Sequence, residues 1–287
     1  MNNTPRIAFF GTSDFSVRVL EALKRNAIMP ALIVTVSDKP VGRKHVLTPP
    51  PVKIWAEENK INFLQPVKLK DLDFLYKLKD KSYDLFVVAA YGKIIPSSVL
   101  ELPKHGALNV HPSLLPRFRG AAPIETAILE EKETGVTIIR IDAEMDHGPI
   151  VSQQKLDIIW PQDAEIASKI LAEAGGEMLA RIIPAWIRNE IHEITQDESR
   201  ATYTRKIETK DGEINLNDFP EKNWKKYLAY RHSPGVYFFT KRNQKDTRVI
   251  VTKALFENGQ FVIQCVKPEG KKEMGYEDFK RGEKVVF

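Results

Sequence analysis

Strand-like and helix-like segments alternate over about the first two hundred residues, and this alternation restricts the fold more than any other feature. Apolar runs predict strands at 6–10, 31–36, 61–64, 84–90, 106–111 and 135–141. Apolar residues at helical spacing predict helices at 14–25, 51–59, 72–79, 122–131 and 163–188, the last bending or ending at Pro184. This pattern is typical of crossover helices on a parallel sheet. We therefore predict an α/β fold with a Rossmann-like, open, mostly parallel sheet, followed by a hairpin-like excursion at 149–158.

The last third of the chain has a different pattern. Residues 189–210 are polar and lack a clear period, so we place the joint of two domains there, with a catalytic domain at 1–204 and a small C-terminal domain at 205–287. The second domain is predicted to hold a helix at 221–231 and strands at 235–240, 247–255, 260–267 and 284–287. Several short strands in so small a space favour a small antiparallel β-barrel. The OB-like type, complete or shortened, is one candidate.

The positive charge of the chain lies in its last part. Residues 205–287 hold 18 Lys and Arg against 12 Asp and Glu, whereas residues 1–204 hold 25 against 26. A basic appendage on a nearly neutral body favours a polyanionic partner, because Lys and Arg near phosphates release counterions. A solvated surface explains the same charge equally well.

The composition excludes several classes of protein. The single Cys265 allows no intramolecular disulfide and no cysteine-rich zinc site. No run of about 18 apolar residues is present for a membrane span, and the amino-terminal residues lack the apolar core of a signal peptide. We therefore expect a cytoplasmic protein that uses no metal. We also expect a monomer, although no sequence feature indicates the oligomeric state.

An asparagine and a histidine stand two residues apart where the fifth predicted strand ends. Side chains at this spacing on a strand point to the same side, so Asn109 and His111 share a face. Pro112 favours an extended conformation at His111 and removes a backbone donor, which ends the strand. The carboxyl edge of an open α/β sheet is where such folds bind ligands, so both residues are candidates for function.

A loop rich in carboxylates, residues 142–149, follows the sixth predicted strand. If that strand neighbours the fifth, the loop can bring a carboxylate beside His111. An amide, an imidazole and a carboxylate suit acyl transfer to an amine: the amide stabilises the oxyanion, the histidine moves protons, and the carboxylate orients or recharges the histidine. Each of these residues taken alone also has a purely structural interpretation, as a turn-former or a hydrogen-bonded surface group.

The first strand and helix do not carry a dinucleotide site. The turn between them has one glycine, Gly11, where the pyrophosphate-binding fingerprint needs three, and Phe15 stands close to where the backbone would approach the phosphates. No glycine-rich Lys-Ser/Thr loop for nucleotide phosphates is present either. An NAD-dependent function is therefore not expected.

The run 109–120 resembles, almost letter for letter, the signature of the 10-formyltetrahydrofolate-dependent formyltransferases. Its continuation through Ile124 and the loop 37–51 resemble the methionyl-tRNA formyltransferase family in particular. The same resemblance extends over 11–15, 49–53, 89–96 and 133–137. It is weakest in the C-terminal part, where family members commonly carry a longer barrel.

The resemblance assigns roles to residues of this chain. The family's catalytic set, an Asn-x-His pair and a later loop aspartate, matches Asn109, His111 and Asp146. The folate pocket would be lined by Ser113, Leu114, Leu115, Pro116 and Tyr91. A pterin needs a flat apolar slot, and Met145 can supply a wall beside the leucines. The family commonly carries a small residue where this chain has His147, which we interpret as a loop residue.

The predicted contacts with tRNA lie in two places. Loop 37–51 is long for a strand-to-helix connection, and in the family the corresponding loop enters the acceptor-stem end of the tRNA. Arg43 matches the arginine that matters there, and Lys44 follows it. In the C-terminal domain we predict phosphate contacts from Lys225, Lys226 and Arg231.

The resemblance thus implies an enzyme that moves a formyl group from 10-formyltetrahydrofolate to the α-amine of initiator methionyl-tRNA. Either His111 or Asp146 can take the proton of the amine; we favour His111 with Asp146 behind it and Asn109 polarising the formyl oxygen. Two alternatives stay open. One is a sugar-nucleotide N-formyltransferase with the same folate site, and the other is an RNA-binding relative without catalysis.

Overall fold

The computed structural model describes residues 5–41, 45–79, 81–130, 132–242 and 245–282. The chain divides into two compact units. The first unit holds described residues within 1–120, 133–157 and 168–203, and the second unit holds those within 121–132, 158–167 and 204–287. None of the helices in the described ranges combines the length and the apolar character that a bilayer crossing requires.

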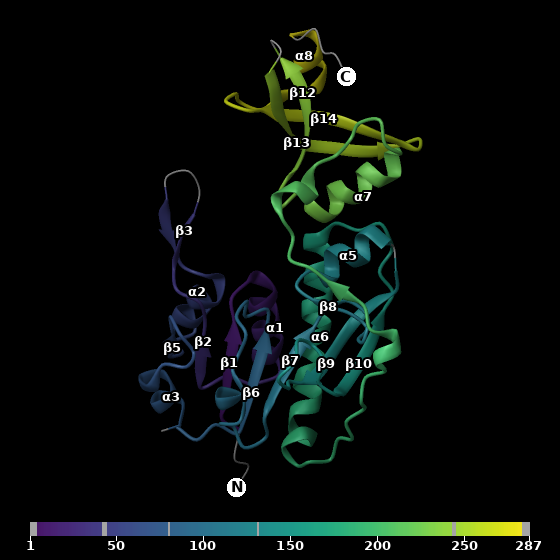
Figure 1. The fold of residues 1–287 in the computed structure, drawn as a ribbon. Coiled ribbons are helices and arrows are strands. Elements are labelled where there is room, and N and C mark those ends of the chain that lie inside the picture. The colour runs from purple at the N-terminus through teal and green to yellow at the C-terminus, as the bar shows by residue number, and fades with distance from the viewer. Residues whose placement is uncertain (1–4, 42–44, 80, 131, 243–244, 283–287) are drawn as a thin grey trace. The chain divides into compact units, whose positions relative to one another are not determined.

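The first unit is built on a seven-stranded sheet with the order β10-β9-β7-β6-β1-β2-β5 (Figure 1). Its strands are β1 (Ile7–Gly11), β2 (Leu32–Val34), β5 (Phe63–Leu64), β6 (Leu85–Ala89), β7 (Ala107–His111), β9 (Thr134–Arg140) and β10 (Ile150–Leu156). Strands β5, β2, β1, β6 and β7, which are consecutive in the sheet, run parallel to one another. Strand β9 runs antiparallel to β7, and β10 runs antiparallel to β9. The predicted open, mostly parallel sheet is confirmed, and the predicted excursion after the sixth strand is β10.

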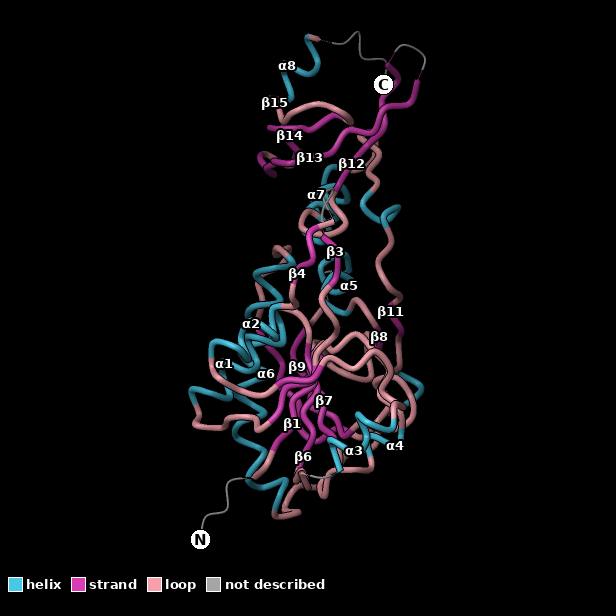
Figure 2. Tube along the Cα trace, turned by 90° about the vertical axis from the view of Figure 1, so that its left-hand side faces the viewer, coloured by secondary structure: helices cyan, strands magenta, loops and turns pink. Residues whose placement is uncertain are grey.

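Helices cover both faces of this sheet (Figure 2). On one face lie α1 (Asp14–Arg25), α2 (Pro51–Glu58) and the part of α6 (Ala164–Ile187) that belongs to the first unit. On the other lie α3 (Leu72–Lys79) and the short α4 (Ser97–Leu100), which the sequence did not predict. Between β2 and α2, a hairpin forms from β3 (Lys39–Val41) and β4 (Val46–Thr48).

Helix α6 continues through Pro184 to Ile187, so of the two predicted outcomes, a bend or an end at Pro184, the end does not occur. A proline in the last turn removes one backbone donor at a place where few further helical bonds follow. The turn is held by its neighbours instead, because Ile183 and Trp186 are buried and the Trp186 indole donates to the His105 carbonyl at 2.9 Å. Burial of these side chains outweighs the lost hydrogen bond.

The close approach of α6 to β7 shows from which face of the sheet the polar residues of β7 project. A Cβ added at Gly175 of α6 would lie 2.5 Å from Val110 Cγ1, so only glycine lets the helix lie this close. Since Val110 faces α6, its neighbours Asn109 and His111 project from the opposite face of the sheet. Ala107, on that same side, packs into the apolar cluster that includes Phe74.

The second unit combines helices with a separate sheet. Helix α5 (Pro123–Glu130) packs against α7 (Pro220–Tyr230). The sheet has the order β12-β13-β14-β15, with β12 (Val236–Arg242), β13 (Lys245–Glu257), β14 (Gln260–Pro268) and β15 (Met274–Gly275) antiparallel to their neighbours. Helix α8 (Tyr276–Arg281) follows. The Trp224 ring of α7 stacks on Phe256, with ring centroids 6.0 Å apart.

The predicted small C-terminal β domain thus takes the form of a four-stranded antiparallel sheet. In the part of the chain that the structure describes, β12 and β15 are its two edges, so this sheet is open. The strand predicted at 284–287 lies outside the described residues, and β15 and α8 were not predicted. The domain division at 204 and 205 stays a prediction; the contacts of the chain add 121–132 and 158–167 to the C-terminal unit.

The remaining elements are short. A two-residue strand, β8 (Arg119–Gly120), pairs with β11 (Tyr203–Thr204), and the single-turn helices η1 (Glu198–Arg200) and η2 (Thr209–Gly212) flank β11 in the chain. Residues 196–203, which include η1, lie in the stretch that the sequence pattern presents as a joint. We call them the 196–203 segment.

Candidate active site

Three side chains that are far apart in the sequence meet on the face of β7. Asn109 Nδ2 lies 3.4 Å from Asp146 Oδ1, and His111 Nδ1 lies 3.6 Å from Asp146 Oδ2. The backbone N–H of Gly120 donates to Asp146 Oδ2 at 2.8 Å. The predicted juxtaposition of amide, imidazole and carboxylate is therefore present, while the catalytic roles of the three residues stay a prediction.

The Asp146 carboxylate does not reach this site directly from the end of β9. Because β9 runs antiparallel to β7, Arg140 at its end pairs with Leu108, near the beginning of β7. The loop after β9 then turns back and places Asp146 beside Asn109 and His111 on the face of the sheet. The condition set from the sequence, that these two strands are neighbours, is met. The sequence does not predict that they run antiparallel.

The histidine is held in one tautomer. His111 is 4 % exposed, and its Nε2 lies 2.9 Å from the Phe118 carbonyl oxygen. Since a carbonyl only accepts, Nε2 must carry the hydrogen in the neutral ring. The lone pair is then at Nδ1, the nitrogen that faces Asp146. His111 therefore presents a basic nitrogen toward the carboxylate, as a proton acceptor requires.

The backbone of Asp146 has an unusual conformation that its surroundings must support. Its φ is +52°, in the left-handed region that non-glycine residues seldom adopt. The Gln196 amide donates to the Asp146 carbonyl at 2.8 Å and to the Gly148 carbonyl at 2.7 Å. A Cβ at Gly148 would lie 1.8 Å from the Arg140 carbonyl oxygen, so the loop can close this tightly only with glycine there.

A buried arginine, Arg119, binds the same segment, 196–203, that holds this loop through Gln196. Arg119 is 1 % exposed, and its Nη2 lies 2.8 Å from Gln196 Oε1 and 2.6 Å from Glu198 Oε1. The Glu198 carboxylate raises the pKa of Arg119, and the guanidinium in turn lowers the pKa of Glu198. Thr202 accepts from the Phe118 N–H through Oγ1 at 2.9 Å, and so fixes the residue that holds His111.

These supporting residues were missed from the sequence. Arg119 lies within the run 109–120 that carries the family resemblance, without a role of its own there, and Gln196, Glu198 and Thr202 lie within the predicted joint. Arg119 and Gln196 are 77 positions apart, and no local period marks a polar residue that will be buried. The one local signal is the Asp197 cap, whose side chain accepts from Ser199 N–H and predicts a turn but no partner.

The residues predicted to line a folate pocket differ in accessibility. Ser113 is fully buried and its hydroxyl donates to the Arg117 carbonyl at 2.6 Å. Leu115 is 3 % exposed, and its N–H donates to Thr137 Oγ1 at 3.2 Å. Leu114 and Pro116 are half-buried, and Met145 is 61 % exposed. These last three side chains are accessible for contact with a ligand.

Tyr91 lies within the apolar core. Its side chain is 2 % exposed and its ring meets Phe10 edge-on, with the centroids 5.5 Å apart. Burial raises the pKa of Tyr91 to about 12. Its carbonyl accepts from the Thr12 hydroxyl at 2.8 Å. In this conformation any contribution of Tyr91 to a ligand pocket comes from its backbone, or from its support of neighbouring residues.

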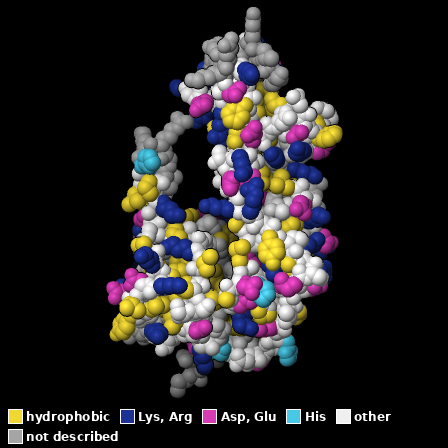
Figure 3. Space-filling view, viewed as in Figure 1, with side chains coloured by type: hydrophobic (Ala, Val, Ile, Leu, Met, Phe, Trp, Pro, Cys, Tyr) yellow, Lys and Arg dark blue, Asp and Glu magenta, His cyan; other side chains and the backbone are white. Residues whose placement is uncertain are grey.

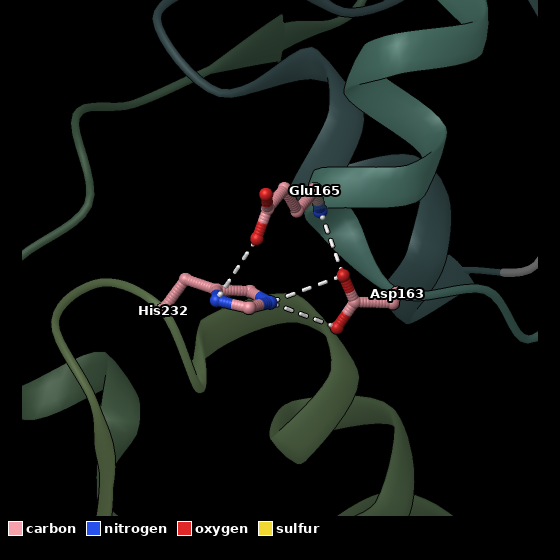
Figure 4. A group of neighbouring side chains, drawn as sticks. All are labelled: Asp163, Glu165 and His232. Atoms are coloured by element: carbon pink, nitrogen blue, oxygen red, sulfur yellow. Dashed lines mark hydrogen bonds and ion pairs between the residues drawn. The ribbon is translucent and has the colours of Figure 1, made fainter. Parts of the chain in front are cut away.

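A second cluster of ionisable groups lies in the second unit (Figure 4). Asp163, Glu165 and His232 point toward one another, with His232 Nε2 3.1 Å from both Asp163 oxygens and Nδ1 3.4 Å from Glu165 Oε2. Arg231 Nε lies 2.7 Å from Asp163 Oδ2, so a guanidinium already occupies the position of a cation there. Asp163 Oδ1 also accepts from the Glu165 N–H at 3.0 Å, as a helix cap does. The cluster is a salt-bridge network.

The basic residues predicted to contact tRNA have partners within the chain where the structure describes them. Lys226 Nζ donates to the Glu213 carbonyl at 2.6 Å, Arg231 is paired with Asp163, and Lys225 is half-buried. Arg43 and Lys44 lie outside the described residues. Figure 3 shows Lys and Arg side chains intermixed with Asp and Glu over the region of α7. The predicted phosphate contacts of α7 stay a prediction.

Comparison with known proteins gives the site a context. The model of a family described as formyl transferase matches residues 5–183. A methionyl-tRNA formyltransferase from Halalkalibacterium halodurans is 39 % identical, over 96 % of this chain and 94 % of its own length. The chain belongs to the formyl transferase family, among its methionyl-tRNA formyltransferase members. A second such relative, from Dictyoglomus thermophilum, is 35 % identical over 96 % of each chain.

Solved formyl transferase structures share the fold at lower sequence identity. A methionyl-tRNA formyltransferase from Clostridium thermocellum superposes with a TM-score of 0.60 at 17 % identity, over 92 % of this chain and 98 % of that one. An N-formyltransferase from Helicobacter canadensis, solved with folinic acid and dTDP-3-aminofucose, gives 0.61 at 18 % identity, over 88 % and 89 %. The formyl transferase fold predicted from the sequence is thus shown.

Proposed function

We propose that this formyl transferase moves the formyl group of 10-formyltetrahydrofolate to the α-amino group of methionyl-tRNA. The observation that carries the proposal is the placement of Asp146 against both Asn109 and His111, with the basic Nδ1 of the histidine facing the carboxylate. The relatives of 35 % and 39 % identity that carry the name methionyl-tRNA formyltransferase support the choice of acceptor.

In the proposed reaction the uncharged amine attacks the formyl carbon and a tetrahedral intermediate forms. The Asn109 amide donates to the oxyanion; its present bond to Asp146 is long, at 3.4 Å, and can be exchanged for a stronger one. His111 Nδ1 takes the proton of the attacking amine, and Asp146 stabilises the imidazolium that results. Collapse of the intermediate breaks the bond between the formyl carbon and N10 of the folate, and the leaving N10 receives the proton that His111 took from the amine, which returns the ring to its neutral form. Asp146 as the direct proton acceptor is the alternative within the same site.

For the folate we propose a slot beside this site. Leu114, Pro116 and Met145 offer apolar surface, and backbone groups of the loop 142–146 supply in-plane donors and acceptors for the pterin. Thr137 and Gln153 pin the backbone near Leu114, because Thr137 Oγ1 donates to the Ser113 carbonyl at 2.6 Å and Gln153 Nε2 donates to the Leu115 carbonyl at 2.9 Å. A rigid wall of this kind suits a flat ligand.

For the tRNA we propose the two regions named from the sequence, loop 37–51 and the basic C-terminal part. Lys225, Lys226 and Arg231 can contribute if RNA phosphates replace their present intramolecular partners. The proposed substrate implies a cytoplasmic enzyme, and we propose a monomer, which sedimentation can test.

The test is formyl transfer from labelled 10-formyltetrahydrofolate by the purified chain to three acceptors in parallel. These are methionyl initiator tRNA, methionyl elongator tRNA and an amino-sugar nucleotide. We expect labelled formyl-methionyl initiator tRNA, and its loss with the His111→Ala variant. Transfer to the sugar nucleotide instead would move the protein to the sugar-nucleotide branch, and tRNA binding without transfer to any acceptor would refute the enzymatic proposal.

A further inference from the structure

The loop that carries Asp146 contains a titratable side chain with no part in the reaction proposed above. His147 follows Asp146 directly, and its side chain is 36 % exposed. Its Nδ1 lies 2.6 Å from Asp142 Oδ2, and its Nε2 lies 3.5 Å from Glu198 Oε1. The imidazole therefore bridges two carboxylates, one in its own loop and one in the 196–203 segment.

The protonation of His147 decides whether both contacts are attractive. An ionised Asp142 only accepts, so Nδ1 carries a hydrogen in either state of the ring. When Nε2 is also protonated, the imidazolium attracts Glu198; when it is not, a lone pair faces the carboxylate. The hydrogen bond to Asp142 raises the pKa of His147, followed by the charges of Asp142, Glu144 and Glu198. The imidazolium therefore persists to higher pH than in a free histidine.

Glu198 continues the connection to the carboxylate of the active site. It accepts two hydrogen bonds from Arg119, at 2.6 and 3.0 Å, and Arg119 also donates to Gln196 Oε1. The Gln196 amide in turn holds the carbonyls of Asp146 and Gly148, the residues on either side of His147. The side chain of His147 and the backbone on both sides of it are thus held by the same segment.

We propose that His147 is a positioning residue that fixes the left-handed backbone of Asp146, and with it the carboxylate beside Asn109 and His111. When His147 is an imidazolium, its contacts with Asp142 and Glu198 hold the loop in place. When His147 loses its proton, the contact with Glu198 is no longer attractive and the loop is held less firmly. The charged groups that face this network are those of Asp142, Glu144, Glu198, Arg119 and Arg140, the last through its charge on Asp142. The predicted effect on turnover rests on the proposed function; the effect on Asp146 does not.

The first test compares turnover of the wild type and His147→Asn as a function of pH. Asparagine keeps a donor near the position of Nδ1, does not titrate and does not reach Glu198. We expect the wild type to exceed the variant in kcat by about twofold to fivefold near pH 6, the size of a partly exposed ion pair. The ratio should approach one above the pKa of His147. His192→Asn, at an exposed histidine of the first unit, is the matched control and should give a ratio near one throughout.

The second test reads the position of Asp146 without turnover. The Gly120 N–H donates to Asp146 Oδ2, so its NMR shift follows the carboxylate. Labelling Arg with 13C and Gly with 15N selects the Arg-Gly pairs of the chain, at 119–120 and 281–282. We expect the Gly120 resonance to shift with the titration of the His147 ring, and His147→Asn to lose this inflection.

The outcomes separate the two proposals. A Gly120 resonance that ignores the titration of His147, or a turnover ratio that does not change with pH, overturns the positioning role. A chain that shows the coupled titration but transfers no formyl group keeps the positioning role and refutes the proposed function.

Discussion

Replacing Asp146 by asparagine tests the centre of the proposed mechanism with little change to the fold. Asparagine has nearly the same shape, keeps an oxygen that can accept from the Gly120 N–H, and tolerates the backbone φ of +52° found at this position. What the variant removes is the negative charge 3.6 Å from His111 Nδ1. The variant therefore measures how far that charge stabilises the imidazolium that forms during transfer.

The expected magnitude follows from the geometry. Two unit charges 3.6 Å apart attract by about 4 to 5 kcal/mol at an effective dielectric constant of about 20. The Asp146 side chain is 15 % exposed, so water and ions reduce this attraction. Since about 1.4 kcal/mol corresponds to a tenfold change in rate, we expect kcat to fall by about 10²- to 10³-fold.

The assay is formation of formyl-methionyl-tRNA with both substrates saturating, so that the rate reports kcat. We expect the KM for each substrate to change little, because the carboxylate acts on a charge that is absent before the amine attacks. Thermal unfolding of Asp146→Asn should occur within about 2 °C of the wild type. If kcat stays within about fivefold of the wild type, the carboxylate is not the counter-charge of the imidazolium and the mechanism is wrong. If folate binding is lost together with kcat, Asp146 contributes to the pocket instead.

Three further predictions address the rest of the site, the tRNA and the half-buried acid Glu125. Asn109→Ala should lower kcat by about 10²- to 10³-fold through loss of the oxyanion donor and His111→Ala by about 10²- to 10⁴-fold; wild-type turnover at saturating substrates would contradict these roles. Arg43→Ala should weaken the use of methionyl-tRNA and leave folate binding unchanged, whereas equal activity on tRNA at moderate salt would remove loop 37–51 from the acceptor site. Burial raises the pKa of Glu125, so the stability that its neutral form provides is complete below the unfolded pKa and is lost as pH rises through the folded pKa. Glu125→Gln should therefore unfold at a higher temperature at pH 7, by up to about 2 °C, with no difference near pH 4, and calorimetry showing no gain at pH 7 would contradict this.

The secondary structure of the first unit could be predicted because its signals are local. The five buried residues of β6 are a continuous apolar run, and the predicted helix at 14–25 has the bounds of α1. An end of α6 at Pro184, one of the two outcomes predicted there, does not occur, because burial of Trp186 overrides the local rule on which it rests. The β3–β4 hairpin within 37–51 was read as a long loop, because three-residue strands give too short a pattern to detect.

The candidate site could be predicted only in part, because only some of its residues are marked by a local pattern. Asn109 and His111 stand at the end of a strand before a proline, and this local pattern indicates their shared face. The position of Asp146 depends on the antiparallel pairing of β9, which no residue within β9 indicates. Tyr91 illustrates the same limit, since the family resemblance implies that it lines a folate pocket, whereas its side chain packs against Phe10 in the core.

The 196–203 segment shows why polar support for an active site escapes sequence reasoning. A buried apolar side chain repeats with the period of its element, whereas Gln196 is buried because its amide matches two carbonyls 48 and 50 positions earlier. Burial of a polar side chain is favourable only where each of its polar atoms has a hydrogen-bond partner. Here Arg119 donates to Gln196 Oε1, the remaining polar atom of that side chain. The strained backbone of Asp146 requires this support, since a left-handed aspartate persists only where its surroundings hold it. The segment that the pattern presents as a joint between domains is therefore part of the structure of the candidate site, and shortening it should disturb Asp146 before it disturbs the sheet.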